Sequence, residues 1–74
     1  MNTERLVYMA NQIGVFFSSQ SGANPQASIA NHLKRFWDPR MRRELVAYVA
    51  AGGKGVDEVV LGAVGMLDES DAKP

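Results

Sequence analysis

The sequence of 74 residues predicts an all-α fold, a compact array of three or four short helices with a disordered C-terminal tail. Apolar residues recur at three- and four-residue steps through most of the chain, which is the spacing of one helix face. Asn-Pro and Asp-Pro pairs are typical of helix starts, and a glycine cluster is typical of a helix end. We expect a single helical domain at residues 1–67, followed by the tail at residues 68–74.

The first helix is expected to begin at Asn2 or Thr3, either of which is a suitable N-cap. Gly14 interrupts its apolar pattern, and glycine inside a helix costs up to about 1 kcal/mol relative to alanine. Gly14 therefore either weakens the end of the helix or allows another backbone to come close. A connector with strong turn chemistry follows at residues 18–25. The apolar stripe of this helix consists of Leu6, Met9, Ala10, Ile13, Phe16 and Phe17.

Two proline-containing pairs define the second and third helices. Asn24 is expected to cap the second helix, with Pro25 at its first position. Pro39 ends that helix, because a proline disfavours helical geometry in the residue before it. Since Asp38 and Pro39 also make a good start for a third helix, the two helices should meet in a rigid joint with almost no loop. Apolar residues of the second helix are Ile29, Ala30, Leu33, Phe36 and Trp37.

The glycine-rich stretch "AAGGKG" is expected to end the third helix, because Gly52 can adopt a left-handed conformation. A short fourth helix is expected from Asp57, with apolar residues up to Leu67. Its β-branched residues and two glycines make its pattern weaker than that of the others. The apolar side of the third helix contains Met41, Leu45, Tyr48 and Val49.

Composition excludes several kinds of site. The chain has no cysteine, so it forms no disulfide and provides no thiolate ligand, and a single His32 cannot build a metal site without carboxylates. The formal net charge is zero, whereas a nucleic-acid-binding domain is usually clearly basic. No secretion signal is apparent and no apolar stretch approaches the ~20 residues of a membrane span. The cytoplasm is the expected compartment.

The small size of the chain points to a partner. A chain of this length buries only about 60% of the surface that it exposes when unfolded. Below roughly 70–80 residues, a core usually needs a disulfide, a metal or a partner. Since the sequence offers neither a disulfide nor a metal site, we expect another protein to complete this domain.

Charge is concentrated in two regions of the sequence. Residues 34–43 carry five basic side chains and one acidic one, while residues 57–71 carry five acidic side chains. The acidic end could lie across the basic joint, or the asymmetry could mark a binding face. Arginines in the first turn of a helix oppose its dipole, so something besides helix stability should account for them. Arginine and tryptophan are enriched at binding hot spots.

We therefore predict a protein-docking surface at the joint, with a solvated charged face or a site for an anionic ligand or nucleic acid as alternatives. The predicted partner-binding residues are Arg35, Phe36, Trp37, Arg40, Met41, Arg42 and Arg43.

Aromatic residues occur as two adjacent pairs, at positions 16 and 17 and at positions 36 and 37. Most of these rings are expected in the core. Because neighbours on a helix point about 100° apart, one member of each pair can face outward, and an exposed apolar patch would mark an interface. His32 flanks the apolar stripe and is expected to be a hydrogen-bonded structural histidine. No catalytic, cofactor-binding or metal-binding residue is predicted, since a short helix with Ser28 and His32 cannot supply an orienting group and an oxyanion site together.

Three segments invite comparison with a known family: "LVYMANQIGVFF" at residues 6–17, "IANHLKRFWDPRMR" at residues 29–42 and "LVAYV" at residues 45–49. With these segments the chain resembles the delta subunit of NAD-dependent, molybdenum- or tungsten-containing formate dehydrogenases. The resemblance runs from about Arg5 to Val49, and its most specific part is residues 36–42. After Gly52 the likeness is limited to a glycine-containing link and a short apolar segment.

The resemblance implies a place in a larger enzyme. Such enzymes oxidise formate to carbon dioxide at a bis-molybdopterin guanine dinucleotide centre, with molybdenum or tungsten, in a large alpha subunit. Electrons then pass along iron–sulfur clusters to FMN in a beta subunit and on to NAD, and a gamma subunit is also present. By this resemblance the chain is not an enzyme by itself and holds no cofactor. It is expected to be an accessory subunit that supports assembly or stability of the alpha subunit.

Two other functions stay open at this stage. One is a small helix-turn-helix module that binds nucleic acid with its third helix in the groove. The other is a helper in insertion of the anionic pterin cofactor. We also expect a weak homodimer when the chain is isolated, because a surface meant for a partner often pairs with itself.

Overall fold

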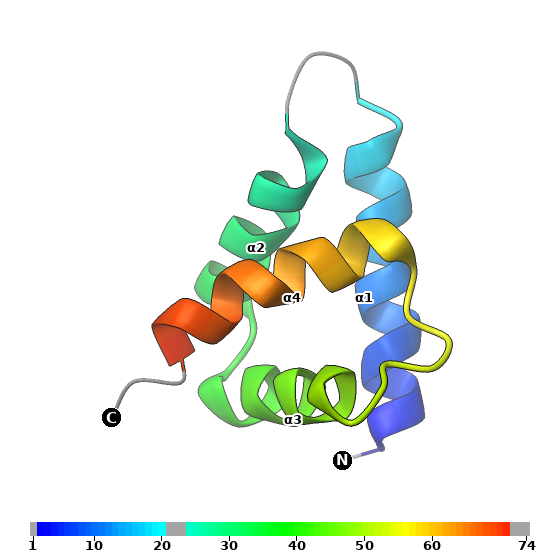
Figure 1. Ribbon diagram of the computed structural model, residues 1–74. Helices are drawn as coiled ribbons and strands as arrows, with labels where there is room; N and C mark the ends of the chain where they lie inside the picture. Colours follow the sequence, from blue (N-terminus) through cyan, green and yellow to red (C-terminus); the bar gives the residue numbers. More distant parts are fainter. Residues whose placement is uncertain (1, 21–23, 72–74) are drawn as a thin grey trace.

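The computed structural model describes residues 2–20 and 24–71, and it contains four helices. In Figure 1, α1 and α2 run in opposite directions and diverge downward, α3 spans the space between their lower ends, and α4 lies across both. The all-α prediction is confirmed. The helices are α1 (Thr3–Ser18), α2 (Pro25–Phe36), α3 (Pro39–Ala50) and α4 (Glu58–Asp71).

The helix starts follow the capping residues in the sequence. Asn2, Asn24 and Asp38 are the N-caps of α1, α2 and α3. In each case the side-chain oxygen accepts hydrogen bonds from backbone N–H groups of the first turn, which would otherwise lack partners. Such a cap is typically worth about 1 kcal/mol. The expected starts of these three helices are therefore confirmed, with Asn2 rather than Thr3 capping α1.

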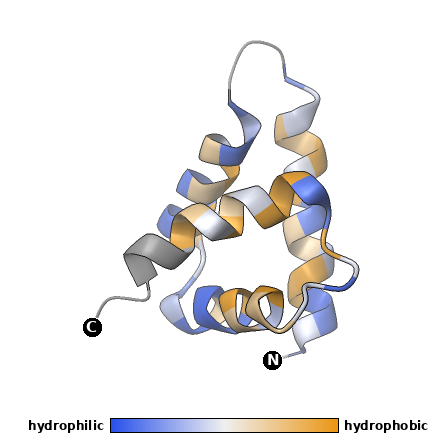
Figure 2. Cartoon of the chain, in the orientation of Figure 1, coloured by the Kyte–Doolittle hydropathy of each residue, from blue (hydrophilic) through white to orange (hydrophobic). Residues whose placement is uncertain are grey.

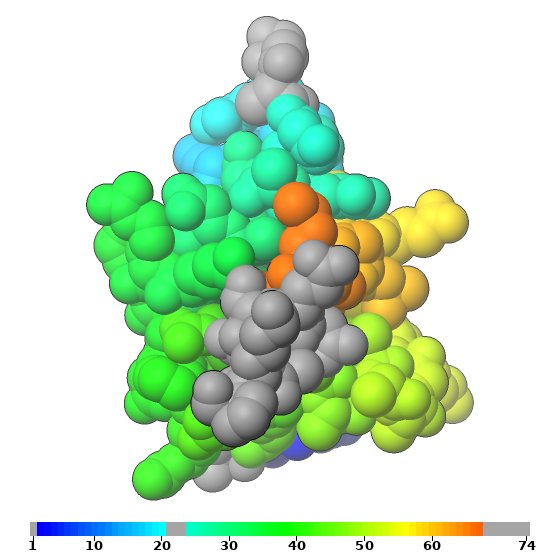
Figure 3. Space-filling model, turned by 60° about the vertical axis from the view of Figure 1, so that its left-hand side comes forward, coloured from blue at the N-terminus to red at the C-terminus, as the bar shows by residue number. Residues whose placement is uncertain are grey.

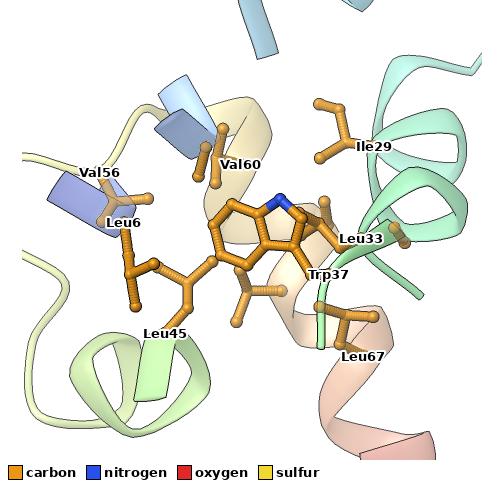
Figure 4. Close-up of a cluster of buried hydrophobic side chains, with 12 residues drawn as sticks. Leu6, Ile29, Leu33, Trp37, Leu45, Val56, Val60 and Leu67 are labelled. Atoms are coloured by element: carbon orange, nitrogen blue, oxygen red, sulfur yellow. The ribbon is translucent and has the colours of Figure 1, made fainter. Parts of the chain in front are cut away.

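A single apolar core lies where the four helices meet. Figure 2 shows apolar and polar residues alternating along the helices. Trp37 follows the last residue of α2, and its indole lies in the middle of the cluster, near Val60 of α4 and Leu45 of α3 (Figure 4). Buried residues of the core are Leu6, Ala10, Ile29, Ala30, Leu33, Trp37, Leu45, Val56, Val60, Ala63, Val64 and Leu67.

Gly14 lies where α1 and α4 approach each other. A Cβ atom built on Gly14 would lie 2.8 Å from Val60 Cγ2 and 3.3 Å from Val59 Cγ1, both on α4. Of the two roles expected for this glycine, close approach of a second element is the one observed. The neighbour is a pair of valine side chains rather than a backbone segment.

The glycine-rich loop after α3 closes that helix with paired hydrogen bonds. Gly52 N–H donates to the Val49 carbonyl and Gly53 N–H donates to the Tyr48 carbonyl, each at 3.0 Å. These are the two bonds of a Schellman motif, which satisfies the last carbonyls of a helix. Gly52 has φ of +136° and Gly53 has φ of +64°, a region that favours glycine. The expected left-handed end of α3 is confirmed.

Two side chains of α1, Asn11 and Thr3, attach this helix to distant parts of the chain. Asn11 Nδ2 donates to the Gly55 carbonyl at 2.9 Å, and Asn11 Oδ1 accepts from the Asp57 backbone N–H at 3.0 Å. Asn11 thereby holds the loop before α4 against α1. Near the start of α1, Thr3 Oγ1 donates to Glu44 Oε2 of α3 at 2.6 Å.

The fourth helix differs from the expected one at its ends. It begins at Glu58 rather than Asp57, whose carbonyl accepts the first helical hydrogen bonds. It continues past Leu67 to Asp71, so the first part of the expected disordered tail has a helical backbone. The reason is that no glycine or proline follows Gly65 within the described part, so nothing in the backbone ends the helix earlier. Residues 72–74 of the expected tail lie outside the described residues.

Candidate protein-docking surface

The joint between α2 and α3 is held by Arg42. Its guanidinium Nη1 donates to the carbonyls of Leu33 at 3.3 Å and Lys34 at 3.2 Å, and also to the carbonyl of Trp37. Leu33 and Lys34 lie in the last turn of α2 and Trp37 is its C-cap, so the guanidinium lies at the end of the helix where the dipole favours a cation. Arg42 therefore opposes the dipole of its own helix and complements that of α2. This contact accounts for one of the three arginines at the start of α3.

In each of the two aromatic pairs, one ring is buried or partly buried and the other is exposed, as the helix geometry predicts. Trp37 is only 6% exposed and belongs to the core, while its neighbour Phe36 is 71% exposed. In α1, Phe16 is 58% exposed and Phe17 is partly buried against the core. The expectation that one member of each pair faces outward is confirmed. As a consequence, Trp37 can offer little of its ring to another molecule.

Four aromatic side chains form a continuous row from α1 onto α2, which we call the aromatic ladder: Phe16, Phe17, His32 and Phe36. The ring centroids of Phe16 and Phe17 are 5.1 Å apart, those of Phe17 and His32 5.9 Å, and those of His32 and Phe36 4.8 Å. All three distances lie in the range of favourable ring–ring contacts. The row ends at each side in a ring that is largely exposed.

His32 lies between two rings of the ladder, where a hydrogen-bonded structural histidine was expected. Its imidazole is partly buried between Phe17 and Phe36. Within residues 2–20 and 24–71 it makes no hydrogen bond, so that part of the expectation is wrong. The physical reason is its neighbourhood, because the residues packed against it are phenyl rings, which offer faces rather than acceptor atoms.

The basic side chains of the predicted site have different environments. Arg35, Arg40 and Arg43 are exposed, while Arg42 is partly buried. Arg35 follows His32 by three residues, so the two lie next to each other on the surface of α2. In Figure 3 the light-blue end of α1 and the green end of α2 lie along the same edge of the molecule.

The predicted partner-binding set is therefore only partly gathered on one surface. Phe36 belongs to the aromatic ladder and Arg35 adjoins it, whereas Met41 is partly buried and Trp37 is in the core. That these residues contact a partner stays a prediction. Phe16, Phe17 and His32 were not predicted as site residues. The two adjacent aromatic pairs were the available signal in the sequence, but their meeting across α1 and α2 depends on how the helices pair.

The donor atoms of this chain do not fit the metal centres that the resemblance implies for the other subunits. The sequence contains no cysteine for an iron–sulfur cluster. Among the described residues, no three side chains of histidine, cysteine, aspartate or glutamate come together in a way that could hold a metal ion. Within the same residues, no helix is both long and apolar enough to cross a membrane.

Comparison with known families agrees with the resemblance seen in the sequence. The family model of the NADH-dependent formate dehydrogenase delta subunit FdsD matches residues 5–64. The match continues past Val49, where the resemblance was expected to weaken, through the glycine-rich loop and into α4. Searches of curated proteins and of solved structures find no match. Because the family model covers well over half of the sequence, the chain belongs to the NADH-dependent formate dehydrogenase delta subunit family.

Proposed function

We propose that this chain is a non-catalytic accessory subunit of NAD-dependent formate dehydrogenase that binds the alpha subunit and supports its assembly or stability. The family provides the link to the enzyme, and the exposure of Phe36 is the observation that supports binding. Phe36 is 71% exposed although it adjoins the core residue Trp37 on a well-capped joint.

A partner that covered the exposed rings of this domain would gain binding free energy by burying them. Burying a phenylalanine side chain stabilises by about 1.5–3 kcal/mol. The core is already filled by other residues, so Phe16 and Phe36 have no internal use of this kind. Aromatic residues, including phenylalanine, and arginine are enriched in protein–protein interfaces. The ladder and Arg35 provide this combination.

The two alternatives have less support. A nucleic-acid-binding module would need its arginines for phosphates, but Arg42 is engaged with carbonyls of α2 and the whole chain has a formal net charge of zero. A role in pterin insertion rests on positive charge alone. We therefore retain the accessory, subunit-binding role.

The test is expression of the alpha, beta and gamma subunits with and without this chain. We expect the yield of assembled complex to fall several-fold without it, because subunits that lose a stabilising partner are degraded more. Formate-dependent NAD reduction per cell should fall in parallel. Activity per assembled, metal-loaded alpha subunit should stay unchanged.

The control measurement is the metal content of the purified alpha subunit. A complex that assembles in full but lacks metal would favour the pterin-insertion role instead. Equal yields, equal metal content and equal activity with and without the chain would contradict the proposal.

A further inference from the structure

We propose that the aromatic ladder and Arg35 together form the docking surface for an amphipathic segment of the alpha subunit, one whose apolar side chains are flanked by carboxylates. This inference rests on the proposed function and specifies which surface is used and what chemistry the partner brings.

The ladder is a preorganised apolar surface. Its rings contact one another at centroid distances of 4.8–5.9 Å, so each ring restricts the rotamers of the next. A surface whose side chains are already ordered loses less conformational freedom on binding. The ladder therefore suits the apolar side of a partner segment.

His32 adds a polar function in the middle of the row. Its ring makes no hydrogen bond within the described part of the chain, and in neutral form an imidazole has one N–H donor and one acceptor nitrogen. A carboxylate or a backbone carbonyl of the partner would satisfy the donor. A purely apolar partner would leave this donor without a partner at the interface, which is unfavourable.

The cation beside the ladder favours an acidic partner. Arg35 adjoins His32 on α2, and two further exposed cations, Arg40 and Arg43, follow on α3 after the joint. Guanidinium groups pair with carboxylates through two parallel hydrogen bonds. A second copy of this chain would bring the same cations to the same surface, and like charges at an interface are repulsive. Charge complementarity thus favours the alpha subunit with flanking carboxylates over a homodimer.

The test uses two substitutions, Phe36→Ala and Arg35→Glu, each with a matched control. Tyr8→Ala is the control for loss of an exposed aromatic, because Tyr8 is 64% exposed on α1 and lies outside the ladder. Lys54→Glu is the control for charge reversal, because Lys54 is exposed in the glycine-rich loop. Arg42 is not suitable for substitution in this test, because its guanidinium holds the joint between α2 and α3 and its loss would disturb the fold. Circular dichroism of each variant checks that the fold is retained.

Binding is measured by titrating each variant onto immobilised formate dehydrogenase complex prepared without this chain. We expect Phe36→Ala and Arg35→Glu each to raise Kd about tenfold or more, as hot-spot residues do. Tyr8→Ala and Lys54→Glu should stay within about twofold of the unchanged chain, as near-neutral surface positions do. The effect of Arg35→Glu should shrink at high salt, which screens exposed charges.

The outcomes separate this inference from the proposed function. If the unchanged chain does not bind the complex, the proposed function fails. If it binds and both test variants bind as well as their controls, the docking surface is wrong and the proposed function stands. If Phe36→Ala loses binding and Arg35→Glu has no effect, the prediction that the partner segment carries carboxylates beside Arg35 is wrong. If sedimentation shows self-association that Phe36→Ala abolishes, while this variant still binds the complex normally, the ladder binds a second copy of the chain and the inference is wrong.

Discussion

Replacement of Trp37 by alanine is expected to unfold most of the isolated chain. The indole is 6% exposed and lies in the middle of a core to which all four helices contribute (Figure 4). Truncating a buried aromatic to alanine costs about 3–5 kcal/mol. A core in a domain of this size supplies roughly 3–5 kcal/mol of net stability. The loss is therefore comparable to the whole free energy of unfolding. Far-UV circular dichroism with urea titration measures it.

Phe36→Ala is the matched control, since it removes the neighbouring aromatic at the same end of α2. Phe36 is 71% exposed, so its truncation should change the free energy of unfolding by about 0.5 kcal/mol or less. Equal unfolding midpoints for Trp37→Ala and Phe36→Ala would contradict the assignment of one ring to the core and the other to the surface.

This contrast also limits the use of Trp37 in docking experiments. Loss of complex formation by a Trp37 variant would reflect unfolding as much as loss of a contact. The adjacent Phe36 separates the two effects, because its ring is exposed at the surface and absent from the core cluster.

Gly14→Ala is expected to lower the free energy of unfolding by about 1–2 kcal/mol, which is typical of an overpacked core. The added methyl group would lie 2.8 Å from Cγ2 of Val60, a side chain that is fully buried and cannot swing into solvent. Either α4 moves away from α1 or the valine leaves its preferred rotamer. This loss outweighs the gain in helix propensity, which is at most about 1 kcal/mol. Thermal and urea unfolding both measure it.

Gly65→Ala is the control for the same change in an open position. A Cβ atom built on Gly65, within α4, has no neighbour within 4 Å. We expect this variant to gain about 0.5–1 kcal/mol through helix propensity alone. A similar gain from Gly14→Ala would show that α1 and α4 do not approach each other as described.

Local features of this fold are well determined by the sequence. Asn24 with Pro25 and Asp38 with Pro39 start α2 and α3 because capping and proline geometry act over only a few residues. Gly52 ends α3 for the same kind of reason. The rigid joint between α2 and α3 follows directly from these local rules.

Features that depend on pairing between distant helices were not predictable in detail. The 100° spacing of adjacent residues indicates that Phe36 and Trp37 diverge, but the packing of the other helices against α2 determines which of them is buried. The contact of His32 with Phe17 requires α1 and α2 to lie together in one register. The role of Arg42 likewise depends on three-dimensional proximity to the end of α2.

The central claim, that the aromatic ladder contacts the alpha subunit, is tested most directly by site-specific photo-crosslinking in the assembled complex. A benzophenone amino acid replaces Phe36 in one variant and the equally aromatic, exposed Tyr8 in another. We predict a covalent product with the alpha subunit from position 36, mapped by mass spectrometry to an apolar segment with neighbouring carboxylates, and little product from position 8. Crosslinking to the alpha subunit from position 8 but not from position 36 would contradict the account.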